Sequence, residues 1–131
     1  MENKKCRVFY ECWQMECCGD PFAVGDWIEW TVVKAENLSS TVDLGNVDYC
    51  YEAHSNEGNF YSLKGKVEAI FILYEKYEPK NNTNFFVPIY GELIKTKCVK
   101  RFVSDKKGMQ ASGFLVELSN FVVEPCKSDF R

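Results

Sequence analysis

The strongest pattern along the chain is a long run of apolar residues between positions 63 and 77. Two sets of apolar side chains alternate within it: Val67, Ala69, Phe71 and Leu73 on one face, and Ile70 and Ile72 on the other. Successive side chains of a strand point to opposite faces of a sheet. Apolar residues on both faces therefore predict a central or strongly curved strand.

A second strand is predicted after the polar turn Val24-Gly25-Asp26. The alternation that follows puts Ile28, Trp30 and Val32 on one face and Trp27, Glu29 and Thr31 on the other. The face that carries Glu29 and Thr31 is the more polar one. We therefore expect Trp30 to be buried in the core and Trp27 to be at least partly exposed.

The rest of the chain also reads mainly as strands and turns. The predicted elements are a strand over 6–13, a compact turn over 17–21, a helical turn over 47–54, a loop over 79–84, a bent strand over 85–103, its hairpin partner over 110–118, and a last extended piece at Val122 and Val123 that ends before Pro125. The helical turn rests on the spacing of Val47, Cys50, Tyr51 and His54. Residues 34–62 are otherwise the least regular part of the chain.

Composition supports a β fold. Val and Ile number eighteen against twelve for Ala and Leu, and twenty aromatic residues join them. We predict a mostly all-β single domain over residues 1–131, with five to seven strands and one irregular or short helical segment. Closing the sheet removes its unpaired edges, which favours a small curled β-barrel, SH3-like or OB-like (oligonucleotide-binding type). A β-sandwich is the alternative.

Charge is unevenly distributed around a net value of −3. Residues 1–60 hold eleven acids and four bases, whereas residues 61–131 hold eight acids and twelve bases. The concentrated basic stretch consists of Lys95, Lys97, Lys100, Arg101, Lys106 and Lys107, of which strand alternation would place Lys95, Lys97 and Arg101 on one face. The acidic total argues against a nucleic-acid partner, so we expect such binding to be weak and without sequence preference.

Cysteine usage bears on the cellular compartment. The chain has seven cysteines, an odd number, and is long enough to form a core without disulfide staples. No apolar run near the start fits a signal peptide, and none is long enough to span a membrane. We therefore expect reduced thiols, a cytoplasmic location and no membrane partner.

A local motif indicates kinship. The chain reads Trp13-Gln14, then Cys17-Cys18-Gly19, then Pro21-Phe22, and continues into the Gly25-Asp26 turn. In this order it resembles a family of small bacterial proteins of unknown function with a Trp-Gln-x-x-Cys-Cys-Gly-x-Pro-Phe signature. Tyr51-Glu-Ala-His54 and Gly65-Lys-Val67 extend the resemblance along the chain. The resemblance implies no activity.

One candidate site uses thiols. Cys50 and His54 are four residues apart and would share a face of a helical turn, and Cys17 and Cys18 would complete a four-ligand zinc set if the chain turns there. The same cysteines with His54 as base would also suit a thiol nucleophile. Against both stands the common role of free cysteines as small buried hydrophobes. No motif for phosphate, hydride or metalloprotease chemistry occurs.

The other candidate site is aromatic. Most of the aromatic residues are expected in the core, and Trp13, Trp27 and Tyr51 are the candidates to line a groove for a protein or small ligand. We predict a non-catalytic binding or interaction module without a cofactor. The alternative is a zinc- or thiol-dependent site at Cys17, Cys18, Cys50 and His54.

Overall fold

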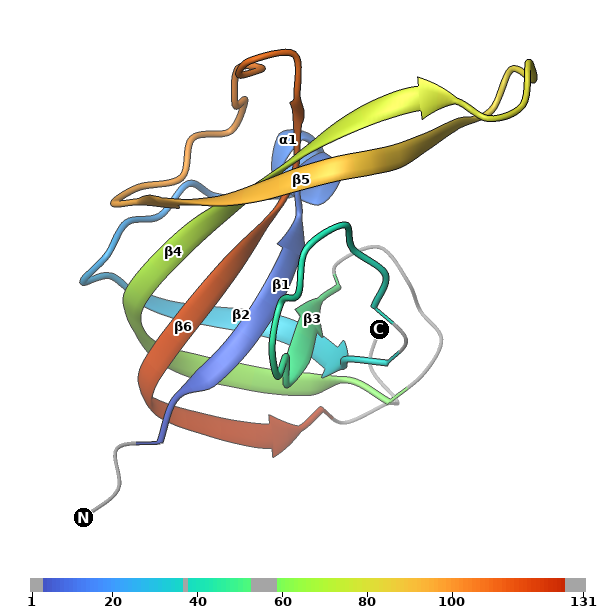
Figure 1. The fold of residues 1–131 in the computed structure, drawn as a ribbon. Coiled ribbons are helices and arrows are strands. Elements are labelled where there is room, and N and C mark those ends of the chain that lie inside the picture. The colour runs from blue at the N-terminus through green and yellow to red at the C-terminus, as the bar shows by residue number, and fades with distance from the viewer. Residues whose placement is uncertain (1–3, 37, 53–58, 127–131) are drawn as a thin grey trace.

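A computed structural model describes residues 4–36, 38–52 and 59–126 of the chain. Over this part the elements are β1 (Cys6–Glu11), α1 (Cys12–Cys18), β2 (Trp27–Lys34), β3 (Tyr49–Tyr51), β4 (Tyr61–Pro79), β5 (Phe86–Thr96) and β6 (Gln110–Pro125) (Figure 1). No helix in the described ranges has the length and apolar character needed to cross a membrane.

The six strands of the described chain form one sheet in the order β2-β3-β1-β6-β4-β5, with a further pairing between β2 and β4. That pairing joins β2, β3, β1, β6 and β4 into a ring, to which β5 is attached through β4 (Figure 1). All neighbours are antiparallel except β1 and β3, which run parallel.

The length and curvature of β4 make the ring possible. Its first part pairs with β2 and its second part with β5, while β6 pairs along most of it. Three register shifts against β6 bend the strand, as extra residues in one partner do. At Gly65, a Cβ atom would lie 3.2 Å from the Cβ atoms of Leu118 and Phe121. A glycine therefore lets the strands approach closely at the bend.

The structure confirms the mostly β prediction and the long strand over 63–77, which lies within β4. Both faces of this strand carry buried residues: Ile70 and Ile72 belong to the main core cluster, and Ala69 and Leu73 are buried outside it. All described strands belong to one ringed sheet, unlike the two packed sheets of the β-sandwich alternative. Assignment to an SH3-like or OB-like type stays a prediction.

Four predicted features were wrong. One is the hairpin of 85–103 with 110–118, since β6 pairs with β1 and β4 and β5 pairs with β4. The first strand ends at Glu11, and the expected strand end and turn are replaced by α1, which buries Cys12, Gln14 and Met15. Within the predicted helical turn over 47–54, Tyr49–Tyr51 is instead strand β3, because it pairs with both β1 and β2, and residues 53–54 lie outside the described chain. Pairing with distant strands outweighs local helical spacing there.

The fourth error concerns the basic stretch. The predicted strand over 85–103 ends at Thr96, because the chain then leaves β4 and forms an isolated bridge between Cys98 and Ala23. Lys95 therefore lies on β5, whereas Lys97 and Arg101 lie beyond it. The three residues do not share one strand face as predicted.

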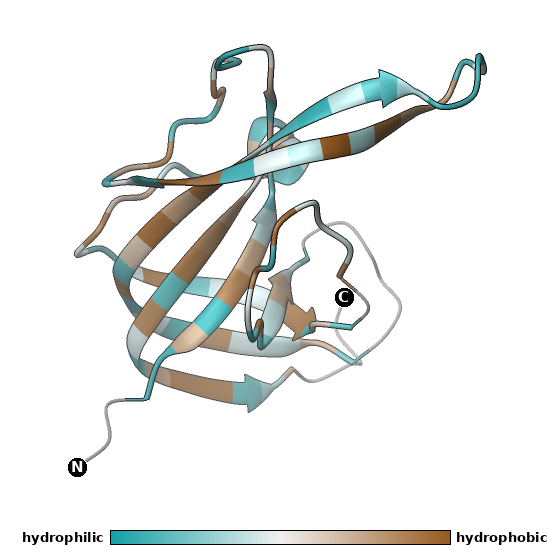
Figure 2. Cartoon of the chain, in the orientation of Figure 1, coloured by the Kyte–Doolittle hydropathy of each residue, from teal (hydrophilic) through white to brown (hydrophobic). Residues whose placement is uncertain are grey.

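The core lies on the inner side of the ring. Hydrophobic and hydrophilic residues alternate along the ring strands (Figure 2). The residues of this core with no exposed surface are Val8, Met15, Val32, Leu63, Val67, Ile70, Phe114, Val116 and Leu118, whereas Leu115 is equally buried but lies outside the cluster. They come from β1, α1, β2, β4 and β6, so the ring strands are held together by shared burial as well as by backbone pairing.

The predicted register of β2 is confirmed. Trp27 is 64% exposed, whereas Trp30 is half-buried and packs in edge contact with Tyr10 at 5.3 Å and Phe22 at 5.1 Å between ring centroids. Trp30 is thus less buried than predicted, since part of its surface borders a cavity.

Replacing Trp30 with alanine is expected to lower the free energy of unfolding by about 3 kcal/mol, because the aromatic contacts are lost and a void is left. Trp27→Ala is the matched control and should cost under about 1 kcal/mol, since its side chain is mostly in solvent. Urea unfolding of both variants measures the difference. Equal losses would contradict the register of β2.

Candidate functional site

The cavity that combines aromatic and charged groups lies beside β2. Its volume is about 470 Å³. It is lined by Tyr10, Cys18, Asp20, Pro21, Phe22, Asp26, Trp27, Ile28, Glu29, Trp30, Thr31 and Tyr51. These residues come from the ends of β1 and α1, the segment between α1 and β2, β2 itself and β3. We call this space the β2 cavity.

Four aromatic rings form the inner part of the β2 cavity. Tyr10 and Tyr51 are stacked, with ring centroids 3.8 Å apart and planes within 9°. Trp30 contacts both rings edge-on, and Phe22 packs against Trp30 and Tyr10. Offset stacking and edge contacts of this kind hold aromatic rings in fixed positions. The cavity therefore has a preformed aromatic wall.

The rings differ in how much surface they offer to a ligand. Tyr10 and Phe22 are 1% and 5% exposed, whereas Trp30 and Tyr51 are half-buried and Trp27 is mostly exposed. Burial, together with the neighbouring Tyr51 hydroxyl, raises the pKa of Tyr10, so its phenol stays neutral. Trp27, Trp30 and Tyr51 are thus the rings that a bound molecule would touch.

The charged groups that line the β2 cavity are carboxylates. Asp20, Asp26 and Glu29 are all exposed, and no lysine or arginine is among the described lining residues. Bases lie outside it: Lys64 and Lys66 are the cross-strand partners of Glu29 and Trp27 on β4. The cavity itself therefore favours positive charge.

The segment between α1 and β2 is anchored, so the outer wall has a defined place. Val24 N–H donates to the Lys97 carbonyl at 2.9 Å, and Val99 N–H donates to the Phe22 carbonyl at 2.7 Å. The turn is completed by Gly25, whose φ of +97° lies in the region that glycine favours. Asp26 Oδ2 accepts a hydrogen bond from Ala23 N–H at 2.9 Å, which places this carboxylate at the rim.

Two of the three predicted ligand-binding residues lie together. Trp27 and Tyr51 line the β2 cavity, whereas Trp13, on α1 and 50% exposed, is not among its described lining residues. Sequence reasoning missed Tyr10, because a strand residue with aromatic character looks like ordinary core. The signal that was available is strand alternation, which places Tyr10 on the same face as the buried residues Cys6 and Val8.

The predicted metal ligands are only partly brought together. Cys17 and Cys18 end α1 with their Sγ atoms 2.9 Å apart, and both are exposed. Cys50 lies on β3 next to Tyr51, so strand alternation points it away from the β2 cavity that Cys18 lines. His54 lies outside the described residues. Zinc binding by the full set therefore stays a prediction.

Within the described chain, no group of three or more His, Cys, Asp and Glu side chains is arranged to hold a metal ion. The pKa of Cys18 is raised, first by its hydrogen bond with Cys17 and then by burial, while Arg101 acts in the opposite direction. An activated thiolate requires a lowered pKa. The pair is therefore exposed, and the shift at Cys18 is opposite to the one that an activated thiolate needs.

The raised pKa values of three cysteine thiols predict that the stability of the protein depends on pH. Burial raises the pKa of Cys6 and Cys12 to about 12 and that of Cys50 to about 11. An acid with a raised pKa in the folded state releases its proton first in the unfolded chain, so stability falls as pH rises. We expect the free energy of unfolding to fall above about pH 9, the ordinary thiol value.

Urea midpoints measured from about pH 7 to about pH 10 test this slope. Cys12→Ala should make the slope shallower, and the matched control Cys98→Ala, at an exposed thiol, should leave it unchanged. A flat profile in the unsubstituted protein would contradict the burial of these thiols.

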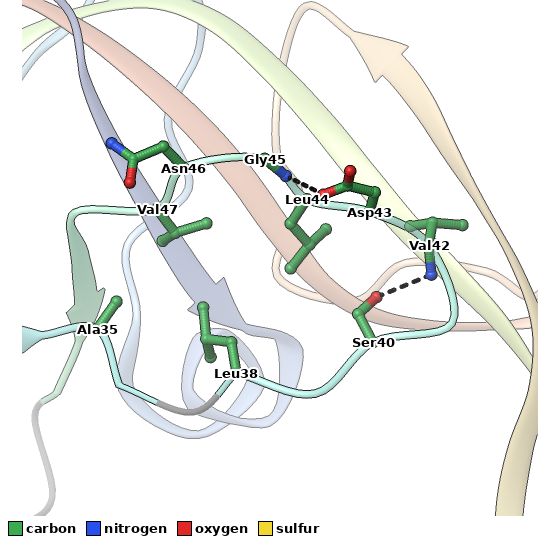
Figure 3. A pocket seen from close by; sticks show the side chains of 9 residues that line it. All are labelled: Ala35, Leu38, Ser40, Val42, Asp43, Leu44, Gly45, Asn46 and Val47. Carbon is green, nitrogen blue, oxygen red and sulfur yellow. Dashed lines mark hydrogen bonds between the residues drawn. The ribbon is translucent and has the colours of Figure 1, made fainter.

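Two other hollows offer less chemistry. One of about 430 Å³ lies within the segment between β2 and β3, where Leu38, Leu44 and Val47 face the same space (Figure 3). The carboxylate in this hollow belongs to Asp43, and its Oδ1 atom accepts a hydrogen bond from Gly45 N–H at 2.8 Å within the same turn. The other, of about 470 Å³, lies under the basic loop that carries Lys100. Neither combines open aromatic faces with several charges of one sign.

Comparison with known proteins supplies a family and no activity. The model of a family of unknown function, DUF6578, matches residues 4–120. No curated protein and no solved structure matches the chain. The predicted kinship with proteins of unknown function is thus confirmed, while the Trp-Gln-x-x-Cys-Cys-Gly-x-Pro-Phe signature and a bacterial origin stay predictions.

Proposed function

The chain belongs to this family of unknown function, and we propose that it is a non-catalytic binding module whose ligand carries a positively charged group. The observation that carries the proposal is the β2 cavity, where open aromatic faces lie beside Asp20, Asp26 and Glu29. A cation over an aromatic face is stabilised by about 0.5–2 kcal/mol, and nearby carboxylates add to the attraction. Guanidinium and ammonium groups fit this chemistry.

We also propose a cytoplasmic setting for this module. The chain has seven cysteines, an odd number, and is long enough to form a core without disulfide staples. Free thiols persist in reducing compartments. A protein or peptide side chain is the cationic ligand that such a compartment offers most widely, so we propose a protein partner.

The proposal is tested with two probes of equal size. Acetyl-arginine methylamide is positively charged, and acetyl-citrulline methylamide has nearly the same shape without the charge. Titration followed by tryptophan fluorescence should show the arginine probe binding roughly tenfold more tightly, which corresponds to about 1.4 kcal/mol. Equal binding of the two probes would overturn the proposal.

Variants locate the binding. Trp27→Ala should weaken the arginine probe by roughly tenfold through loss of the aromatic face. Glu29→Gln should weaken it by about twofold to fivefold, because an exposed carboxylate is screened by solvent. Glu78→Gln is the matched control, since this exposed carboxylate lies on β4 and pairs with Lys76 at 3.9 Å. Loss of binding in the Glu78 variant would contradict the assignment to the β2 cavity.

A thiol-dependent zinc site is the second candidate, favoured by the two adjacent, exposed thiols of Cys17 and Cys18 at the end of α1. Elemental analysis of purified protein should then find zinc in a one-to-one ratio. Cys17→Ser should release it, whereas Cys98→Ser, at another exposed thiol, should not. Protein without zinc would remove this candidate.

A further inference from the structure

Within the described residues, one edge of β2 has no strand partner along the β2 cavity. β4 pairs with β2 from Trp27 to Val32, but β3 pairs with it only from Val32 to Lys34. On the β3 side, therefore, no strand of the described chain covers the stretch from Trp27 to Glu29. Among the described strands, β4 is the one that pairs with β2 there.

Two hydrogen bonds show which backbone groups face this open edge. Thr31 carbonyl accepts from Glu52 N–H at 3.1 Å, so the backbone of Thr31 points to the β3 side. Asp26 carbonyl accepts from Val67 N–H at 2.8 Å, so the backbone of Asp26 points to the β4 side. Since backbone direction alternates along a strand, the N–H and C=O groups of Trp27 and Glu29 point to the open edge.

The β2 cavity runs along these groups. Its lining includes every residue from Asp26 to Thr31. Because successive residues point to opposite faces of a strand, a space that touches all of them borders the edge of the strand. Asp20, Pro21 and Phe22 form the opposite wall. That wall is anchored by the hydrogen bond of Phe22 carbonyl with Val99 N–H. The open edge thus faces a groove with an aromatic inner surface and an acidic rim.

We propose that an extended peptide segment containing arginine or lysine adds to this edge as a further strand. Its backbone bonds to the N–H and C=O groups of Trp27 and Glu29, and its basic side chain enters the aromatic part of the β2 cavity. Strand addition of this kind uses the backbone for affinity and side-chain pockets for specificity. The inference rests on the proposed function and names its ligand.

Charge decides between this partner and a second copy of the chain. A second copy pairing through the same edge would bring its own Asp20, Asp26 and Glu29 against these three carboxylates. Like charges placed opposite one another destabilise strand pairing. A basic segment has the complementary charge, so it is the occupant that the groove favours.

The test leaves the protein unchanged and modifies the ligand. A blocked pentapeptide, Val-Thr-Arg-Thr-Val, should bind roughly tenfold more tightly than acetyl-arginine methylamide, because backbone hydrogen bonds are added. Two N-methylated versions are compared, one modified at the second and fourth residues and one at the first, third and fifth. One version should fall back to the affinity of the single-residue probe, and the other should stay within about threefold of the parent, since only alternate N–H groups face β2.

Amide hydrogen exchange supplies the second readout. With the parent peptide bound, the amides of Trp27 and Glu29 should exchange more slowly, while that of Trp30, already paired with β4, should change little. If the arginine probe binds but both N-methylated peptides equal the parent and no protection appears, strand addition is overturned and the proposed function stands.

The remaining outcomes are equally decisive. If neither the arginine probe nor the pentapeptide binds, the proposed function fails together with this inference. Protection of Trp27 and Glu29 without peptide would show that the edge is already occupied and would overturn the inference. Sedimentation of the free protein would then tell whether a second copy or the chain itself is the occupant.

Discussion

Replacing Phe114 with alanine is expected to lower the free energy of unfolding by about 4 kcal/mol. Phe114 has no exposed surface and lies on β6, directly between Tyr10 of β1 and Ile72 of β4. Its ring meets that of Tyr10 at a centroid distance of 6.3 Å. Truncation would leave a void where three strands of the ring meet. Small domains are stable by only about 5–15 kcal/mol, so the effect is large.

Urea unfolding at neutral pH measures this loss. Phe102→Ala is the matched control, because Phe102 is 68% exposed in the loop after β5 and should cost under about 0.5 kcal/mol. If both phenylalanine variants unfolded at the same urea concentration, the ring would not be built around Phe114. A large loss should also weaken the β2 cavity, since Tyr10 forms part of its wall.

Glu75→Ala is expected to cost about 3 kcal/mol, for a different physical reason. Glu75 lies on β4 with 5% of its surface exposed. Its Oε2 atom accepts hydrogen bonds from Thr41 N–H at 3.1 Å and from Thr41 Oγ1 at 2.9 Å, and Oε1 accepts from Tyr77 Oη at 3.3 Å. Removing the carboxylate would leave these donors without their partner and free the segment that precedes β3.

The matched control is Glu78→Ala on the same strand, whose exposed carboxylate makes only a 3.9 Å ion pair with Lys76 and should matter by under about 0.5 kcal/mol. Glu75→Gln should recover part of the loss, because the amide oxygen still accepts a hydrogen bond. Thermal unfolding of the three variants should therefore rank Glu75→Ala lowest. A Glu75→Ala protein as stable as the control would contradict the role of this carboxylate.

Much of the candidate site could be named in advance, although not assembled. Trp27 and Tyr51 were predicted to line a groove as part of the aromatic set that the core does not absorb, and both line the β2 cavity. Their meeting in one cavity depends on β3, whose local spacing favoured a helical turn instead. Trp13 was also predicted to line the groove, but it is not among the described residues that line the β2 cavity. It lies on α1, which the sequence pattern read as part of a strand and a turn.

Residue alternation by itself determined the β class, the long central strand and the register of β2. These features follow from local rules, because side-chain polarity repeats every second residue and a shift by one would expose Trp30 in place of Trp27. The turn at Gly25-Asp26 was equally readable, since glycine and aspartate suit the backbone there.

Only the tertiary structure decided how the strands close and where they do not. The pairing of β2 with β4 joins residues from distant parts of the chain. Within the described residues, β3 pairs with β2 only from Val32 onward, so Trp27 and Glu29 have a strand partner on one side. No local pattern reports which edge of a strand lacks a partner, because backbone hydrogen bonds are independent of side-chain identity. The same packing decided that Cys18 and Tyr51 share a cavity while Cys50 faces away.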